Sequence, residues 1–233
     1  LASMGEMMSN IAHQWRQPLS VITTVASSLK LKKEYDILSD EEYNQDLNHI
    51  VETANYLSNT IDDFRYYFLP NKDKNLFNTK GLINRCINII NIDFANKHIK
   101  IVQNIEELTM FNFENELLQV MINILNNSKD ELIKIENEQD RVVFIDLYKN
   151  KSELIIKIKD SAGGIPTEII DRVFEPYFTT KHKSQGTGIG LYMSTEIIKK
   201  HMNGNLIVSN EEYTYNNIKC RGAQFTIELP IKE

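Results

Sequence analysis

The sequence predicts an α+β protein made of a helical hairpin followed by an α/β sandwich with its helices on one face of a sheet. Apolar residues are spaced three and four apart over residues 1–33 and again over 47–68. This is the period of helices that pack on other helices. After a polar linker, shorter helical patterns alternate with strand patterns. We therefore expect two domains, residues 1–70 and residues 71–233.

The first predicted helix runs from near residue 1 to about residue 33, and Pro18 within it removes a backbone donor and bends it. Its repeat is already under way at Leu1, so we expect a preceding part of the natural protein to be missing from this sequence. Residues 36–40 break the pattern, with Ser39 or Asp40 as the N-cap of a second helix that ends at Pro70.

Two helices cannot bury two complete apolar seams alone. We therefore expect a four-helix bundle formed with a second copy of the chain, hence a homodimer. The alternative is that the seams pack on the C-terminal domain of the same chain. The second seam comprises Leu47, Ile50, Ala54, Leu57, Ile61, Phe64 and Phe68.

The second domain is predicted from changes of hydrophobic period along the chain. Mostly antiparallel strands interleaved with helices give the sandwich. Helices are expected at 79–96, 114–135 and 187–202, the last ended by Gly204, and strands at 99–105, 141–148, 153–159, 206–209 and 223–229.

The composition argues against several classes of protein. A net charge of -6 and no basic stripe argue against a nucleic-acid partner. Two scattered cysteines do not make a disulfide framework or a Cys-rich metal site. No signal peptide or apolar run long enough to span a bilayer is present. We expect a cytoplasmic fragment, with any membrane anchor of the full-length protein left to the missing N-terminal sensor part.

His13 lies off the apolar seam of the first helix, between the seam residues Ile11 and Trp15. Its imidazole is therefore expected to face solvent or a visiting group. Taken alone, it is more simply interpreted as an ordinary surface histidine. The choice depends on the rest of the chain.

Two stretches of the second domain have the residues of a ligand site. Asn123 and Asn127 share one helix face, where carboxamide oxygens could help to hold Mg²⁺ bound mainly by phosphates, or could simply be exposed. Asp160 opens Asp-Ser-Ala-Gly-Gly-Ile-Pro directly after a strand. Its carboxylate could accept a hydrogen bond from an exocyclic amine such as that of adenine, although a tight turn would use the same residues.

Two further stretches follow. Residues 174–181, Phe-Glu-Pro-Tyr-Phe-Thr-Thr-Lys, give an aromatic anchor and a polar loop that continues to Gln185, the pattern of a lid. Residues 186–191, Gly-Thr-Gly-Ile-Gly-Leu, open a helix and could seat a phosphate. They do not follow a strand directly, which disfavours the dinucleotide-binding motif. They do not end in Gly-Lys-Ser/Thr, which disfavours the other common phosphate-binding loop.

With these four stretches in this order, the chain resembles the sensor histidine kinases of two-component signalling over nearly its whole length. Residues 11–19 look like their phosphoacceptor motif in the form His-x-x-x-Gln-Pro-Leu. The four stretches look like the N, G1, F and G2 boxes. The resemblance implies that residues 1–70 are the dimerisation and histidine-phosphotransfer domain. Residues 71–233 would be the catalytic ATP-binding domain, with the Bergerat fold shared with gyrase, Hsp90 and MutL.

The resemblance also implies the chemistry. His13 would accept the γ-phosphoryl group of ATP and pass it to an aspartate of a response regulator receiver domain. Asn127 would hold Mg²⁺ and Asp160 would receive the adenine amine. Lys181 and Lys183 either neutralise phosphate charge or form a solvated loop face. The residues implied to border the nucleotide are Asn123, Asn127, Asp160, Gly164, Ile165, Lys181, Gly186, Thr187, Gly188, Gly190 and Leu191.

Two departures from the family pattern matter. Gln14 follows the histidine where many members carry Glu or Asp, and an amide cannot act as a base. Either another group accepts the proton, or Gln14 only orients the ring. Ala162 replaces the usual first glycine of the G1 box, where no positive φ is expected. Gln17, one turn after His13, could position a water for dephosphorylation of the partner.

Two other functions remain open. An ATP-hydrolysing clamp of the gyrase or Hsp90 kind would carry a catalytic glutamate where Asn123 stands. A scaffold whose nucleotide site has decayed is disfavoured by Asp160, Asn127 and the glycines.

Overall fold

The computed structural model describes residues 2–68, 73–181, 188–215 and 218–231. In the first helix, side chains are described only at Arg16 and from Pro18 onward. The described residues fall into two compact units. One contains the long N-terminal helices together with residues 179–181, and the other contains the remaining helices and strands.

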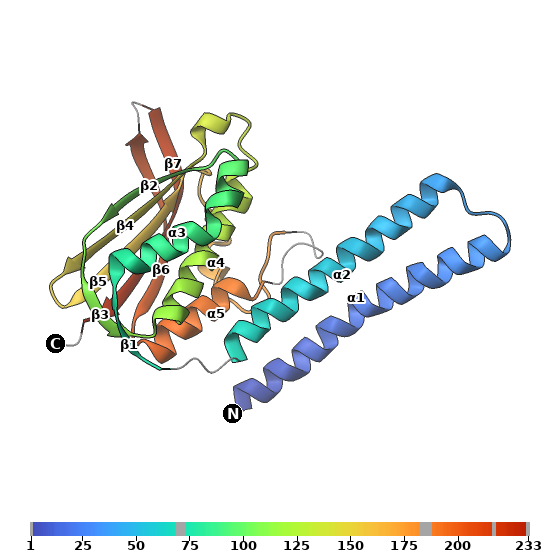
Figure 1. The fold of residues 1–233 in the computed structure, drawn as a ribbon, viewed down its shortest axis with the longest axis horizontal. Helices are drawn as coiled ribbons and strands as arrows, with labels where there is room; N and C mark the ends of the chain where they lie inside the picture. The colour runs from blue at the N-terminus through green and yellow to red at the C-terminus, as the bar shows by residue number, and fades with distance from the viewer. Residues whose placement is uncertain (1, 69–72, 182–187, 216–217, 232–233) are drawn as a thin grey trace. The chain divides into compact units, whose positions relative to one another are not determined.

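The first unit is an antiparallel helical hairpin, as predicted. Helix α1 (Ala2–Glu34) and helix α2 (Asp40–Phe68) lie side by side in Figure 1. Ser39 caps α2, because its Oγ accepts the backbone N–H of Glu42 at 3.2 Å. The Glu42 carboxylate accepts the Ser39 N–H in return, at 3.4 Å. This is a capping box, and the hydrogen bonds from Ser39 lower the pKa of Glu42.

Large apolar side chains of this hairpin stay exposed in a single chain. Leu47, from the predicted seam of α2, is 40% exposed, and Leu31 of α1 is 55% exposed. Burying such groups is favourable by about 25 cal/mol per Å² of apolar surface. The others, among residues whose side chains are described, are Leu19, Val21, Tyr35, Ile37, Tyr43 and Val51.

The second unit is a five-stranded sheet with strand order β2-β4-β5-β7-β6. Only β2 and β4 are parallel, and the other neighbouring pairs are antiparallel. Helices α3, α4 and α5 lie on one face of this sheet (Figure 1), as the sandwich prediction requires. The strands are β2 (Lys100–Ile105), β4 (Val142–Asn150), β5 (Glu153–Asp160), β6 (Asn205–Tyr215) and β7 (Ile218–Pro230). The helices are α3 (Thr79–Asn96), α4 (Glu114–Leu132) and α5 (Gly190–Glu196).

The core lies between the helices and the inward face of the sheet. Alternate residues of the central strands point into it, since side chains alternate between the faces of a strand. These include Val143, Ile145 and Leu147 of β4 and Ile156 and Ile158 of β5, each at most 1% exposed. The packed sheet fixes the end of β5, where the candidate site begins.

Three elements differ from the sequence prediction. Strands β1 (Asn75–Asn78) and β3 (Thr109–Asn112) form a separate two-stranded sheet that was missed because each has only four residues. Helix α5 begins at Gly190 rather than at residue 187, because Gly188 adopts a left-handed φ of 65° that a helix cannot contain. The predicted helix 187–202 is completed by a π turn, Ile197–His201.

The β6–β7 hairpin is the third difference. It is longer than predicted, because its pairing continues to Tyr215 and Ile218 through a largely polar and charged stretch. In the part of the chain that the structure describes, no helix has the length and apolar content needed to cross a bilayer.

Candidate functional site

The candidate site is centred on Asp160, the last residue of β5, which is 4% exposed. One carboxylate oxygen, Oδ1, accepts the backbone N–H groups of Ala162 (3.0 Å) and Ala223 (3.1 Å). The other, Oδ2, accepts the Ser128 hydroxyl of α4 at 3.2 Å. Burial raises the pKa of Asp160, and these three hydrogen bonds oppose that rise. The result is a hydrogen-bond acceptor held in one position in an apolar surrounding.

The turn after Asp160 depends on glycine. Gly163 and Gly164 have φ of 87° and 83°, which L-residues rarely adopt. A Cβ on Gly164 would also lie 2.5 Å from Oδ1 of Asn210. Ala162 does not adopt a positive φ, as expected from the sequence. At Gly163 an added Cβ would meet no atom within 4 Å, so the backbone there is open to a ligand, whereas at Gly164 the Asn210 side chain fills that space.

Asn123 and Asn127 of α4 are both partly buried. Asn123 donates through Nδ2 to the Ser194 hydroxyl at 2.9 Å, and Ser194 donates to the carbonyl of Gly190 at 3.0 Å. A Cβ on Gly190 would lie 2.4 Å from Oδ1 of Asn123. Asn123 thus packs tightly against the start of α5. Asn127 directly precedes Ser128, so α4 carries it to the Asp160 end of the sheet.

The aromatic anchor predicted at residue 174 is present. The Phe174 ring packs edge-on against Phe225 of β7, with centroids 6.4 Å apart. Gly188 (φ 65°) lies against the backbone of Tyr177, because a Cβ there would be 2.4 Å from the Tyr177 carbonyl carbon. The chain just before residue 178 and the chain at Gly188 therefore lie in contact. Leu191 packs against the core.

Several predicted residues lie where the structure does not describe them. Gly186, Thr187 and Lys183 are outside the described residues, as are the side chains of His13, Gln14 and Gln17, whose backbone is helical. Lys181 is described, and its N–H donates to Oγ1 of Thr179 at 3.1 Å.

Sequence reasoning missed four residues that contact the Asp160 turn: Ser128, Asn210, Tyr213 and Gly222. For Ser128 and Gly222 the sequence holds a weak indication of a role at the site. The first adjoins Asn127, and a glycine inside a strand often marks a close backbone approach. Asn210 and Tyr213 lie 50 residues or so further along the chain in a stretch without a motif, so nothing in the sequence pointed to them.

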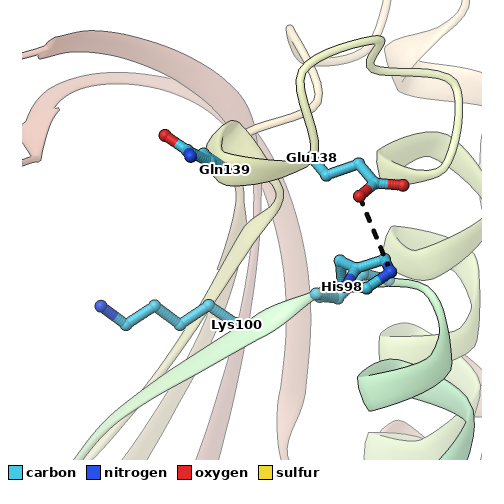
Figure 2. Close-up of a pocket in the computed structure, with 5 residues that line it drawn as sticks. His98, Lys100, Glu138 and Gln139 are labelled. Atoms are coloured by element: carbon cyan, nitrogen blue, oxygen red, sulfur yellow. Dashed lines mark ion pairs between the residues drawn. The ribbon is translucent and has the colours of Figure 1, made fainter.

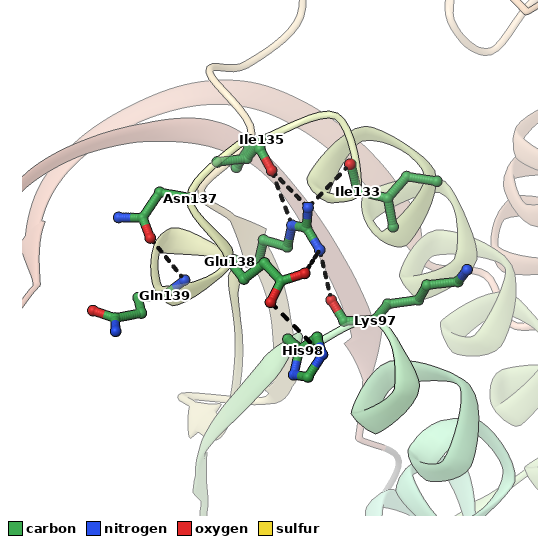
Figure 3. A network of polar contacts seen from close by, with 8 residues as sticks. Lys97, His98, Ile133, Ile135, Asn137, Glu138 and Gln139 are labelled. Atoms are coloured by element: carbon green, nitrogen blue, oxygen red, sulfur yellow. Dashed lines mark hydrogen bonds and ion pairs between the residues drawn. The ribbon is translucent and has the colours of Figure 1, made fainter.

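A polar network centred on Arg141 supports the same end of the sheet. Figure 3 shows the groups that surround it, among them Lys97, Ile135 and Glu138. The Arg141 guanidinium donates to the carbonyls of Lys97 (2.9 Å) and Ile135 (2.7 Å), which follow α3 and α4. It also pairs with Glu138 at 3.5 Å. Next to this network, the Ser161 hydroxyl donates to the carbonyl of Asp140 at 2.6 Å. The turn after Asp160 is therefore fixed to the loop that follows α4.

A pocket beside this network is lined by His98, Ile99, Lys100, Glu138 and Gln139. Figure 2 shows His98 facing Glu138, 3.6 Å away, while the Lys100 side chain is directed elsewhere. The side chains of His98 and Glu138 are both more than half exposed. Exposed ion pairs contribute little to folding stability. None of the predicted site residues lines this pocket.

Comparison with known proteins gives two family matches. Residues 112–233, just over half of the chain, match "Histidine kinase-, DNA gyrase B-, and HSP90-like ATPase". Residues 3–68 match "His Kinase A (phospho-acceptor) domain". The chain belongs to the sensor histidine kinases. In this histidine kinase, Asp160, Gly164, Asn123, Asn127 and the segment around Gly188 all lie within the ATPase match, and His13 lies within the phospho-acceptor match.

Curated relatives of this histidine kinase are also named as kinases. The signal transduction histidine-protein kinase AtoS of Escherichia coli (strain K12) is 26% identical over 99% of this chain and 35% of its own length. Sporulation kinase C of Bacillus subtilis (strain 168) is 28% identical over 100% of this chain and 50% of its own length. This chain thus spans between a quarter and a half of the length of the first relatives it matches.

Solved structures share the fold of this histidine kinase. The complex of histidine kinase ThkA with response regulator protein TrrA contains a chain that matches with a TM-score of 0.69 and 21% identity. The match covers 100% of this chain and 63% of that one. The catalytic domain of ThkA matches 68% of this chain with a TM-score of 0.56 and 24% identity.

Proposed function

We propose that this chain is the ATP-dependent, autophosphorylating core of a protein-histidine kinase. It phosphorylates His13 and passes the phosphoryl group to an aspartate of a response regulator receiver domain. The proposal rests on one observation. A phospho-acceptor match around His13 and an ATPase match around the buried acceptor Asp160 occur in a single chain.

The geometry of the Asp160 turn fits a purine nucleotide. Oδ2 of Asp160 has one hydrogen bond from Ser128, so it keeps lone pairs for the exocyclic amine of adenine. Gly163 beside it leaves open space, because a Cβ there would meet no atom within 4 Å. We assign the nucleotide contacts to Asn123, Asn127, Asp160, Gly164, Ile165, Lys181, Gly186, Thr187, Gly188, Gly190 and Leu191.

Asn127 is the residue that would hold Mg²⁺. Among the described residues, no group of three or more His, Cys, Asp or Glu side chains could bind a metal ion. A carboxamide oxygen suits Mg²⁺ when the nucleotide phosphates supply most of the other ligands. The bound ion would neutralise phosphate charge during transfer. The chain's own task is then to align the reacting groups.

The reaction places a neutral imidazole against the γ-phosphorus. A nitrogen of His13 forms the N–P bond as the bond between the γ-phosphorus and the bridging oxygen of ADP breaks. The imidazolium that results loses the proton on its other nitrogen. Because the Gln14 amide cannot accept that proton, we assign Gln14 to orienting the ring and the proton to another acceptor.

The two domains have separate roles in this proposal. Residues 1–70 form the dimerisation and histidine-phosphotransfer domain, a four-helix bundle with a second copy. The exposed apolar side chains of α1 and α2, such as Leu31 and Leu47, support this arrangement. Residues 71–233 form the catalytic ATP-binding domain. The complex of ThkA with a response regulator protein supports a receiver domain as the partner.

Incubation with γ-labelled ATP and Mg²⁺ tests this function. The wild-type chain should gain label that is lost in acid and kept in alkali, as a phosphoramidate is. The His13→Ala variant should gain none, while His49→Ala, at an exposed position of α2, should label like the wild type. Label that survives in His13→Ala would refute the proposal. Rapid multiple turnover of ATP without any phosphoprotein would instead indicate a clamp-type ATPase.

A second prediction concerns Gln17, which lies one helical turn after His13. We propose that its amide positions a water that attacks the phosphorylated partner. Gln17→Ala should then slow release of phosphate from the regulator about tenfold or more, within the range typical of one positioning group. Autophosphorylation, followed with the same labelled ATP, should stay close to wild type. Equal loss of both activities would contradict this role.

A further inference from the structure

The β6–β7 hairpin contacts the Asp160 turn at several points beyond the sheet itself. The regular pairing of β5 with β7 ends at Lys159 and Gln224. Past that pair, Gly163 donates its N–H to the carbonyl of Arg221 at 2.9 Å. Ala223 donates to Oδ1 of Asp160, as described above. Strand β7 therefore continues to bind the turn after the ladder has ended.

Asn210 of β6 makes the most specific of these contacts. Its Oδ1 accepts the backbone N–H of Ile165 at 2.7 Å, and its Nδ2 donates to the carbonyl of the same residue at 2.7 Å. A carboxamide presents an acceptor oxygen and a donor nitrogen side by side, so it can pair with both backbone groups of one residue at once. The same Oδ1 fills the space that a side chain on Gly164 would need. Asn210 thus fixes both polar groups of Ile165 and the path of the chain before it.

Tyr213, three residues further along β6, holds the other end of the turn. Its hydroxyl donates to the backbone carbonyl of Asp160 at 2.8 Å. Burial raises the pKa of Tyr213, so the hydroxyl remains protonated and continues to donate. The ring is held by Phe144, with centroids 5.3 Å apart, and by Lys159, whose Nζ lies 4.0 Å from the ring centroid. The donor is therefore fixed in position.

We infer that Asn210 and Tyr213 are positioning residues for nucleotide recognition, which hold the 160–165 turn so that Asp160 selects adenine over guanine. The inference rests on the proposed function. Guanine has a carbonyl where adenine has its exocyclic amine, so a fixed carboxylate repels it and accepts from adenine. A looser turn lets the carboxylate move away, which weakens adenine binding and lessens the rejection of guanine.

Calorimetric titration of the full chain with ADP and with GDP, in the presence of Mg²⁺, tests this role. The wild type should prefer ADP. Asn210→Ala should weaken ADP binding about tenfold, since two hydrogen bonds to the turn are lost, and Tyr213→Phe should weaken it about threefold. Both variants should also lower the ratio of ADP affinity to GDP affinity. A purely structural contribution to stability would weaken both nucleotides equally and leave that ratio unchanged.

Two residues of the same hairpin provide matched controls. Tyr215→Phe removes the hydroxyl of a tyrosine whose ring packs on Phe144 and not on the turn. Asn205→Ala removes an exposed amide at the other end of β6. Both variants should bind ADP and GDP with wild-type affinity.

If Asn210→Ala does not fold, two other variants test whether these residues position the turn. They are Tyr213→Phe and Asn210→Asp, which keeps the acceptor oxygen and loses the donor. Variants with wild-type affinity and an unchanged ratio would overturn the inference. A wild-type chain that binds no nucleotide would overturn the proposed function itself.

Discussion

Replacing Gly222 by alanine is expected to abolish nucleotide binding and to lower the stability of the catalytic unit by about 3 kcal/mol. A Cβ at this position would lie 1.6 Å from the backbone carbonyl oxygen of Asp160. Both groups belong to backbone in neighbouring strands, so neither can turn away as a side chain could. The added methyl group must push β7 away from Asp160. This breaks the hydrogen bond from the next residue, Ala223, to the carboxylate.

Gly81→Ala is the matched control for this substitution. The nearest atom to a Cβ at Gly81 is 4.0 Å away, and the residue lies in α3. Alanine should therefore raise stability slightly, by up to about 1 kcal/mol, and leave binding unchanged. Thermal unfolding and ADP titration of both variants measure the difference. Wild-type affinity for ADP in Gly222→Ala would show that contact between β7 and Asp160 does not shape the site.

Replacing Asp160 by asparagine is expected to weaken ADP binding by about 100-fold without unfolding the protein. Asparagine has nearly the same shape, and its Oδ1 can still accept the N–H groups of Ala162 and Ala223. Its Nδ2 replaces the acceptor Oδ2, so it presents a donor to the adenine amine, which is itself a donor. The Ser128 hydroxyl can rotate and accept from Nδ2. ADP binding is weakened, and the buried polar groups stay paired.

The difference in stability between Asp160→Asn and the wild type should depend on pH in a defined direction. The pKa of Asp160 is raised, mainly by burial and also by the charge of Glu131, so the folded protein holds this proton more tightly than the unfolded chain does. Wild-type stability from this group is present at low pH and is lost as pH rises through the raised pKa. Asp160→Asn has no such loss.

The melting temperature of Asp160→Asn relative to wild type should therefore increase from acid to neutral pH. Thermal unfolding at a series of pH values measures this difference. A constant difference across the series would contradict the direction of the pKa shift at this residue.

The sequence predicted the elements with strong periodicity and could not predict those held by distant contacts. Helices α1, α2 and α3 and strands β4 and β5 follow their apolar patterns closely, and in α3, β4 and β5 the apolar face is buried in the core. Strands β1 and β3 are too short to show a pattern. Gly188 shows why a glycine-rich stretch is a poor guide to a helix start. Its positive φ delays α5 to Gly190.

The residues of the candidate site also fall into those that the local sequence predicts and those that only distant contacts reveal. Asp160 and the glycines after it were predicted because their chemistry lies in consecutive residues. The groups that hold them in place come from α4 and from the β6–β7 hairpin, as Ser128 and Asn210 do. A hydrogen bond between residues 32 or 45 positions apart has no local signature, so only the folded structure reveals it.

The central claim is that His13 receives a phosphoryl group from ATP bound at the Asp160 turn. Its most direct test is to map the modified residue by mass spectrometry in alkaline conditions, after the chain has been incubated with ATP and Mg²⁺. We predict a single phosphorylated site at His13 in the wild type and none in Asp160→Asn. Phosphate on another residue, or ADP accumulating while His13 stays unmodified, would contradict the proposed function.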